Sequence, residues 1–131
     1  MERAARITLF IAGLVALYVG AGLLFNPVAF EATSGIQLGS DPALLSEVRA
    51  PGGVVLVAGL FMWLGVARGR FTGPATLVAS GLYLAYGLSR LVGFVLDGSP
   101  GDMLVAVTGV ELVLGVTLAV IGWKRPRAVA A

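Results

Sequence analysis

Three charged residues stand within otherwise apolar stretches of this 131-residue chain: Arg49, Arg90 and Glu111. An ionised side chain that faces hydrocarbon costs roughly 2.5–3.5 kcal/mol on insertion scales, and more by other measures. Such groups therefore pair with one another, face a bundle interior, or become neutral. The chemistries open to them are proton exchange at the carboxyl, anion binding by a guanidinium, and structural ion pairing.

The spacing of Arg90 and Glu111 predicts that they meet. Glu111 follows Asp102 by nine residues, which is about 13 Å along a helix and near the middle of a hydrocarbon core about 30 Å thick. Arg90 lies about two turns inside the outer end of the preceding apolar run. Because the connection "DGSPGD" between the two runs is short, an Arg90–Glu111 pair is the simplest arrangement. A neutral Glu111 bonded to a carbonyl is the alternative.

Other polar residues extend this pair into a predicted pocket that opens to the outer side. Arg49 enters at a similar depth, and Glu47 and Asp97 lie closer to the interface. Two tyrosines precede Arg90 at seven- and four-residue spacings, so they share its helix face. The predicted binding cluster is Glu47, Arg49, Tyr83, Tyr86, Arg90, Asp97 and Glu111. A structural pair with packing tyrosines explains the same residues.

The composition decides the class of protein. Hydrophobic residues make up 58% of the chain and charged residues 12%, about half the charged fraction of soluble domains. The chain has no Cys and no His, so no thiolate or histidine metal site and no cofactor is predicted. The net charge of +2 does not indicate nucleic-acid binding, because the bases fall in short clusters between apolar runs.

Four uncharged or nearly uncharged runs are each long enough to cross a bilayer. We predict an all-α, polytopic membrane protein: a single domain over 1–131, with an antiparallel bundle of four transmembrane helices at about 6–25, 48–67, 73–95 and 103–123. A cleaved signal peptide is the alternative for the first run, but that run is longer than a usual signal and has no clear cleavage site.

The basic residues predict the orientation of the bundle. Seven of the nine lie on one side: Arg3, Arg6, Arg68, Arg70, Lys124, Arg125 and Arg127. By the positive-inside rule both termini are cytoplasmic, as in a multi-pass protein of the bacterial inner membrane.

The first outer connection carries its own helix signals. Asn26 is a candidate cap, Pro27 a first helical residue and Gly35 a stop, which together predict a short interfacial helix. Asp41 is a candidate cap and Pro42 a first helical residue, which predicts that a helix restarts there. If Arg49 lies inside the membrane, this helix is the start of the second span.

In "EVRAPGG", residues 47 to 53, Pro51 lacks the N–H that would bond the Glu47 carbonyl. We expect a kink there that aims Arg49 toward Arg90 and Glu111, while Gly52 and Gly53 let a neighbouring helix pack closely.

The two halves of the chain show a weak internal repeat. "GVVLVAGL" (53–60) and "GVELVLGV" (109–116) agree at five of eight positions. The alignment places Glu111 where Val55 lies, and suggests two parallel copies of a hairpin. Apolar Gly-rich helices also align by chance, so both interpretations stay open.

Several motifs carry a resemblance to a known family: "GLLFNPVAFEATSGIQL", "SEVRAPGG", "GLSRLVGFVLDG" and "VELVLGV". Over about residues 5–123 the chain resembles a bacterial family of four-helix membrane proteins of unknown function, and its architecture is similar to that of the broader DoxX-like group. The resemblance implies the fold and no activity. It marks as signature positions Asn26, Pro27, Glu47, Arg49, Arg90, Asp97, Gly98 and Glu111.

Three functions fit these observations. The first is an accessory membrane module that binds a lipid or small amphiphile. The second is a small oligomeric transporter coupled to protons through Glu111. The third is a structural subunit of a homo-oligomer or larger membrane complex. An enzyme that uses Glu111 or Asp97 as acid and base is less favoured, since the sequence offers no activated nucleophile and no catalytic residue is assigned.

Overall fold

The computed structural model of this chain describes residues 1–126 and contains five helices in that range. They are α1 (Glu2–Phe25), α2 (Pro27–Ala32), α3 (Pro42–Ala67), α4 (Gly69–Asp97) and α5 (Asp102–Lys124). The four long helices are each apolar and long enough to span a membrane. The predicted all-α fold with four spans is therefore confirmed, and this is a multi-pass membrane protein. Arg127, one of the seven bases, lies outside the described residues.

The connection between α1 and α3 has the predicted short helix. Pro27 is the first residue of α2, and the backbone of Asn26 joins the two helices: its N–H bonds Gly22 and its carbonyl accepts from Phe30. The Asn26 side chain makes no capping bond, contrary to the sequence prediction. Gly35 follows the last turn with a φ of +79°, a left-handed conformation that favours glycine.

Three helices start clearly earlier than the apolar runs suggested: α1 at Glu2, α3 at Pro42 and α4 at Gly69. α3 begins at Pro42, where the Asp41 carboxylate accepts a 2.9 Å hydrogen bond from the Ala43 N–H. It continues as helix through Pro51. α4 begins at Gly69 and continues through Pro74, so the expected loop before residue 73 is reduced to Arg68. The Thr72 hydroxyl closes this tight link by donating to the Gly65 carbonyl at 2.7 Å.

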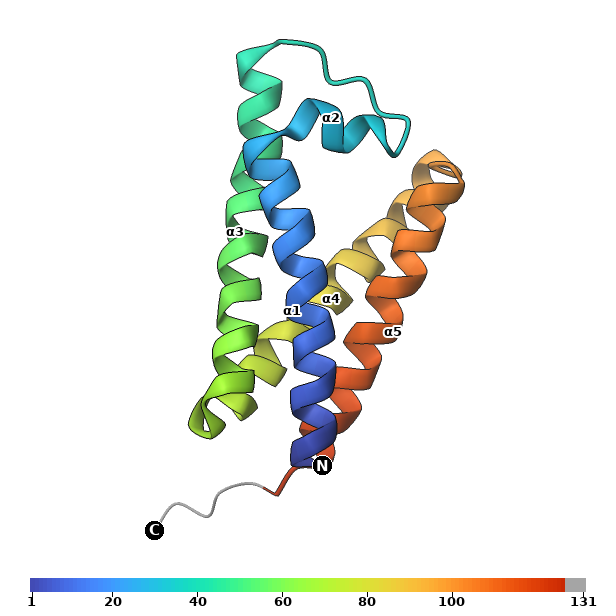
Figure 1. The fold of residues 1–131 in the computed structure, drawn as a ribbon. Helices are drawn as coiled ribbons and strands as arrows, with labels where there is room; N and C mark the ends of the chain where they lie inside the picture. Colours follow the sequence, from blue (N-terminus) through green and yellow to red (C-terminus); the bar gives the residue numbers. More distant parts are fainter. Residues whose placement is uncertain (127–131) are drawn as a thin grey trace.

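The long helices form two pairs (Figure 1). α1 lies along α3, α5 lies along α4, and each neighbour in sequence runs antiparallel to the last. The start of α1 and the end of α5 lie at one end of the bundle, called here the terminal end, and α2 crosses the opposite end, called the α2 end. The pairs meet near the terminal end and diverge toward the α2 end. Consistent with this, the last buried residue of α4 is Gly87, ten residues before that helix ends.

Glycines bring α1 and α3 into backbone contact near the α2 end. A Cβ added at Gly20 would lie 2.5 Å from the Leu56 nitrogen, and one at Gly52 would lie 2.8 Å from the Leu24 nitrogen. The hydrophobic effect does not drive helices together inside a bilayer, so close van der Waals packing at small residues is a main source of attraction between them. The predicted role of Gly52 in close packing is confirmed. Its neighbour Gly53 has no such contact within 4 Å.

Gly52→Ala and Gly53→Ala form a matched pair of variants that tests this contact. We expect Gly52→Ala to push α1 away from α3 and to lower the free energy of unfolding by about 1–3 kcal/mol. Gly53→Ala should be neutral or stabilise the helix by up to about 1 kcal/mol. Thermal unfolding in detergent micelles measures both, and equal effects would contradict the proposed contact.

Candidate functional site

The centre of the candidate site is an ion pair between α4 and α5. The Arg90 Nε donates to Glu111 Oε2 at 2.9 Å, with the Arg90 side chain 31% exposed and the Glu111 side chain 11% exposed. The pairing expected from the short α4–α5 connection is therefore present. Both residues belong to spanning helices, so the pair neutralises two charges that hydrocarbon would otherwise penalise.

Two glycines allow the helices to approach closely on either side of this pair. A Cβ at Gly87, one turn before Arg90, would lie 2.6 Å from the Leu112 side chain. A Cβ at Gly115, one turn after Glu111, would lie 2.9 Å from the Leu84 nitrogen. The interdigitated leucines fill the space on each side and hold the two helices in register. The charged groups therefore meet directly, within hydrogen-bonding distance.

The Arg90 guanidinium retains hydrogen-bonding capacity. Within residues 1–126 its one hydrogen bond is the Nε contact to Glu111. The Tyr86 ring centroid lies 6.0 Å from Arg90 Cζ, at the outer limit of a cation–π contact. Thr108, next to Glu111 on α5, donates to the Leu104 carbonyl at 2.7 Å instead. The Nη groups of Arg90 can therefore donate to a bound molecule without breaking the ion pair.

Glu31 on α2 is a functional candidate that the sequence analysis missed. Burial raises the pKa of the Glu31 carboxyl above its ordinary value of 4.5, and the positive charge of Arg90 lowers it in part. The short helix thus brings a second carboxyl within electrostatic range of Arg90. The sequence showed only an acid in an outer connection. Its position depends on α2 crossing the α2 end, which residue spacing does not specify.

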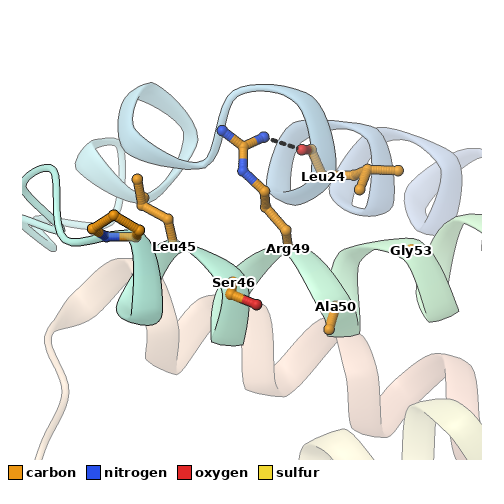
Figure 2. Close-up of a pocket in the computed structure, with 7 residues that line it drawn as sticks. Leu24, Leu45, Ser46, Arg49, Ala50 and Gly53 are labelled. Carbon is orange, nitrogen blue, oxygen red and sulfur yellow. Dashed lines mark hydrogen bonds between the residues drawn. The ribbon is translucent and has the colours of Figure 1, made fainter.

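Arg49 does not join Arg90 and Glu111, so this part of the predicted cluster is wrong. Its Nη1 donates to the Leu24 carbonyl at the end of α1, and Figure 2 shows the guanidinium beside that oxygen. The last carbonyls of a helix lack intrahelical partners, and Arg49 satisfies one of them. It also borders a shallow groove of about 520 Å³ between α1 and α3. Arg49 fastens α3 to α1 and stays apart from the pair.

The other predicted residues divide between structural and exposed positions. The buried Tyr83 donates its hydroxyl to the Ala12 carbonyl at 2.5 Å, which ties α4 to α1. Glu47 and Asp97 are exposed and make no salt bridge with another residue of 1–126. Gly98 ends α4 with a φ of +92°, a conformation that requires glycine. Of the seven predicted binding residues, the structure gathers Tyr86, Arg90 and Glu111.

Removing one partner of the ion pair should destabilise the protein. Glu111→Ala leaves the Arg90 charge unpaired in a spanning helix, and we expect a loss of roughly 1–3 kcal/mol, below the value for fully buried pairs because Arg90 is partly exposed. The double variant Arg90→Leu/Glu111→Leu should recover most of this loss. Thermal unfolding in micelles gives the values, with the exposed Glu47→Ala as a neutral control. A double variant as unstable as the single one would contradict the pairing argument.

The position of Glu31 predicts a pH-dependent contribution to stability. Because its pKa is raised in the folded state, the folded protein binds this proton more readily than the unfolded chain. Stability is then highest below the ordinary pKa of 4.5 and falls as the pH rises through the folded pKa. Glu31→Gln should be more stable than the wild type at pH values above that pKa, and no more stable than the wild type below it. In an NMR titration, Arg90→Gln should raise the Glu31 pKa further; an unchanged value would show that the two groups are not coupled.

Comparison with known proteins gives a family for the chain and no activity. Residues 4–121 match the family described as Domain of unknown function (DUF4345). Neither the curated proteins nor the solved structures gave a match. The expected membership of a four-helix membrane family of unknown function is confirmed by this match together with the four apolar helices. Because the match covers nearly the whole chain, this protein belongs to the DUF4345 family.

Proposed function

We propose that this protein is a small membrane module that binds a lipid or small amphiphile at Arg90, Glu111 and Glu31. The observation that carries the proposal is the state of Arg90: its guanidinium is held by one bond to Glu111, is partly exposed, and has donors left over for a ligand. A guanidinium held in place by a carboxylate is pre-organised, so binding costs little side-chain entropy.

The surroundings favour a ligand with an apolar tail. Toward the α2 end, α4 exposes large apolar side chains after Arg90, including Leu91, Val92 and Val95. In a spanning helix such residues face hydrocarbon or an apolar ligand. The ligand head would accept hydrogen bonds from Arg90 and donate to Glu31 or Glu111. A quinol, a hydroxylated lipid or a zwitterionic lipid with a primary ammonium group meets this requirement.

The charge distribution supports an outward-facing site. The bases at the terminal end include Arg3, Arg6, Arg68, Arg70, Lys124 and Arg125, which by the positive-inside rule favours a cytoplasmic terminal end. The α2 end and the Arg90–Glu111 pair then open to the outer side of a bacterial inner membrane. A ligand would enter from the outer leaflet, and the protein would act as an accessory module, alone or within a homo-oligomer or larger complex.

Thermal-shift screening of the purified protein tests this proposal against lipids, quinones and small amphiphiles. We expect at least one class to stabilise the wild type, with the shift lost in Arg90→Gln and Glu111→Gln. Glu47→Gln serves as the matched control, because Glu47 is exposed and remote from the pair. If both site variants keep every shift of the wild type, the binding site lies elsewhere.

Proton-coupled transport is the alternative, and the position of Glu111 within the α5 span favours it. A carboxyl that exchanges between Arg90 and a proton would serve as the coupling group. Flux in proteoliposomes under a pH gradient distinguishes the two functions. Transport requires a flux that Glu111→Gln abolishes, whereas a binding module shows none. A structural subunit would give neither flux nor ligand shift.

A further inference from the structure

A second groove lies between α4 and α5 at the terminal end, far along both helices from Arg90 and Glu111. Its volume is about 730 Å³, and it is formed by the first turns of α4 and the last turns of α5 with Arg125 and Pro126. Arg70 and Arg125 line it together with Leu77, Leu118 and Trp123. The groove therefore combines two cations with an apolar wall, within two helices that span the membrane.

The Arg125 guanidinium has a donor without a partner. Its Nη2 bonds Glu2 at 2.8 Å, while its Nη1 is buried and finds no partner among residues 1–126. A Cβ added at Gly73 would lie 3.9 Å from that Nη1, so the guanidinium rests against the first turns of α4. An unpaired buried donor of a charged group costs free energy, and an anion bound nearby would offset part of that cost by charge attraction.

Arg70 adds a second positive charge with no acidic partner among the described residues. Its guanidinium lies 4.6 Å from the centroid of the adjacent Phe71 ring. The nearby acid Glu2 is already engaged, at 2.8 Å from Arg125 and 3.7 Å from Arg6. α4 also begins here without a side-chain cap, so its first N–H groups add positive potential. The mouth of the groove therefore keeps a net positive charge, because Glu2 is shared between Arg6 and Arg125 and no described acid pairs with Arg70.

The wall of the groove is suited to hydrocarbon. Leu77 lies in a spanning helix and is 74% exposed, so it faces hydrocarbon. Leu118 also lines the groove and is fully buried. The hydroxyls of Thr76 and Ser80 donate to carbonyls of their own helix, so they do not require a polar ligand. Trp123, 86% exposed, has the amphipathic ring that is typical of the membrane interface. An acyl chain fits along this wall, and a soluble anion would leave it uncovered.

We infer that this groove binds an anionic phospholipid from the leaflet on the side of the two termini. The phosphate lies between the guanidinium groups of Arg70 and Arg125, which both line the groove. One acyl chain lies along Leu77 and Ala119, beside Trp123. Basic pockets between spanning helices are suited to anionic headgroups, and here the cations and the apolar wall occur in one groove. This site is separate from the proposed outer ligand site and does not depend on it.

Fluorescence quenching by brominated lipids tests the assignment. Trp63→Phe leaves Trp123 as the one tryptophan, since the chain has two, and keeps an aromatic ring stacked on Phe10. In phosphatidylcholine vesicles, brominated phosphatidylglycerol should quench Trp123 with an apparent affinity roughly tenfold higher than brominated phosphatidylcholine. Equal affinities of the two lipids would overturn the inference.

Three variants in the Trp63→Phe background test whether the groove causes the preference for phosphatidylglycerol. Arg70→Gln, which breaks no ion pair of the described residues, should reduce it several-fold, and Arg70→Gln/Arg125→Gln should abolish it. Gly122→Leu keeps both charges but fills the groove, because a Cβ there makes only an ordinary 3.5 Å contact with Thr76; it should also abolish the preference.

The control is Arg3→Gln, a base at the same end that does not line the groove. An equal loss in Arg3→Gln would mean general surface attraction and would overturn the site. Retention of the preference in Gly122→Leu would do the same. Displacement of the lipid by millimolar inorganic phosphate would assign the cations to a soluble anion and reject the lipid.

Discussion

The Arg90–Glu111 pair fixes how the α4–α5 hairpin faces its surroundings. A charge in hydrocarbon must find its partner within the protein, and the rotation of each helix brings this guanidinium and this carboxylate to 2.9 Å. The same rotation turns Gly87 and Gly115 into the interface, where leucines of the opposite helix pack against them. The apolar residues on the remaining faces are thereby turned toward lipid.

The arrangement of the rest of the bundle depends on how α1 and α3 pack together and on where the α4–α5 hairpin contacts α1. α1 and α3 pack by glycine contacts as far as Gly20 and Gly52, and Arg49 fastens their α2 end through the Leu24 carbonyl. Tyr83 joins α4 to Ala12 of α1, near the middle of both helices. Beyond this point α4 and α5 diverge from α1 and α3 (Figure 1), and α2 with Glu31 crosses the open end.

Sequence reasoning was most reliable where the physical signal is local. Apolar run lengths predicted the four spans, the Asp41–Pro42 pair predicted the start of α3, and a short connection predicted the Arg90–Glu111 contact. It failed where the outcome depends on distant backbone. The partner of Arg49 is a backbone carbonyl at the end of another helix. Every residue has such a carbonyl, so the residue types do not show which one Arg49 contacts. The proximity of Glu31 to Arg90 likewise depends on the path of the whole first connection.

The aligned segments of the two halves explain why one helix pair contains an ion pair between its helices and the other does not. Val55 is buried in α3 at the position that aligns with Glu111 in α5, and Gly59 and Gly115 each receive the neighbouring helix closely. With valine at this position, the α1–α3 interface needs no counter-charge here, and the two helices pack closely at Gly59. With glutamate, the α4–α5 interface must supply an arginine, whose guanidinium is too large to be sealed between two helices. The exposed edge of Arg90 is therefore a physical consequence of placing Glu111 in that interface, and the proposed ligand site depends on it.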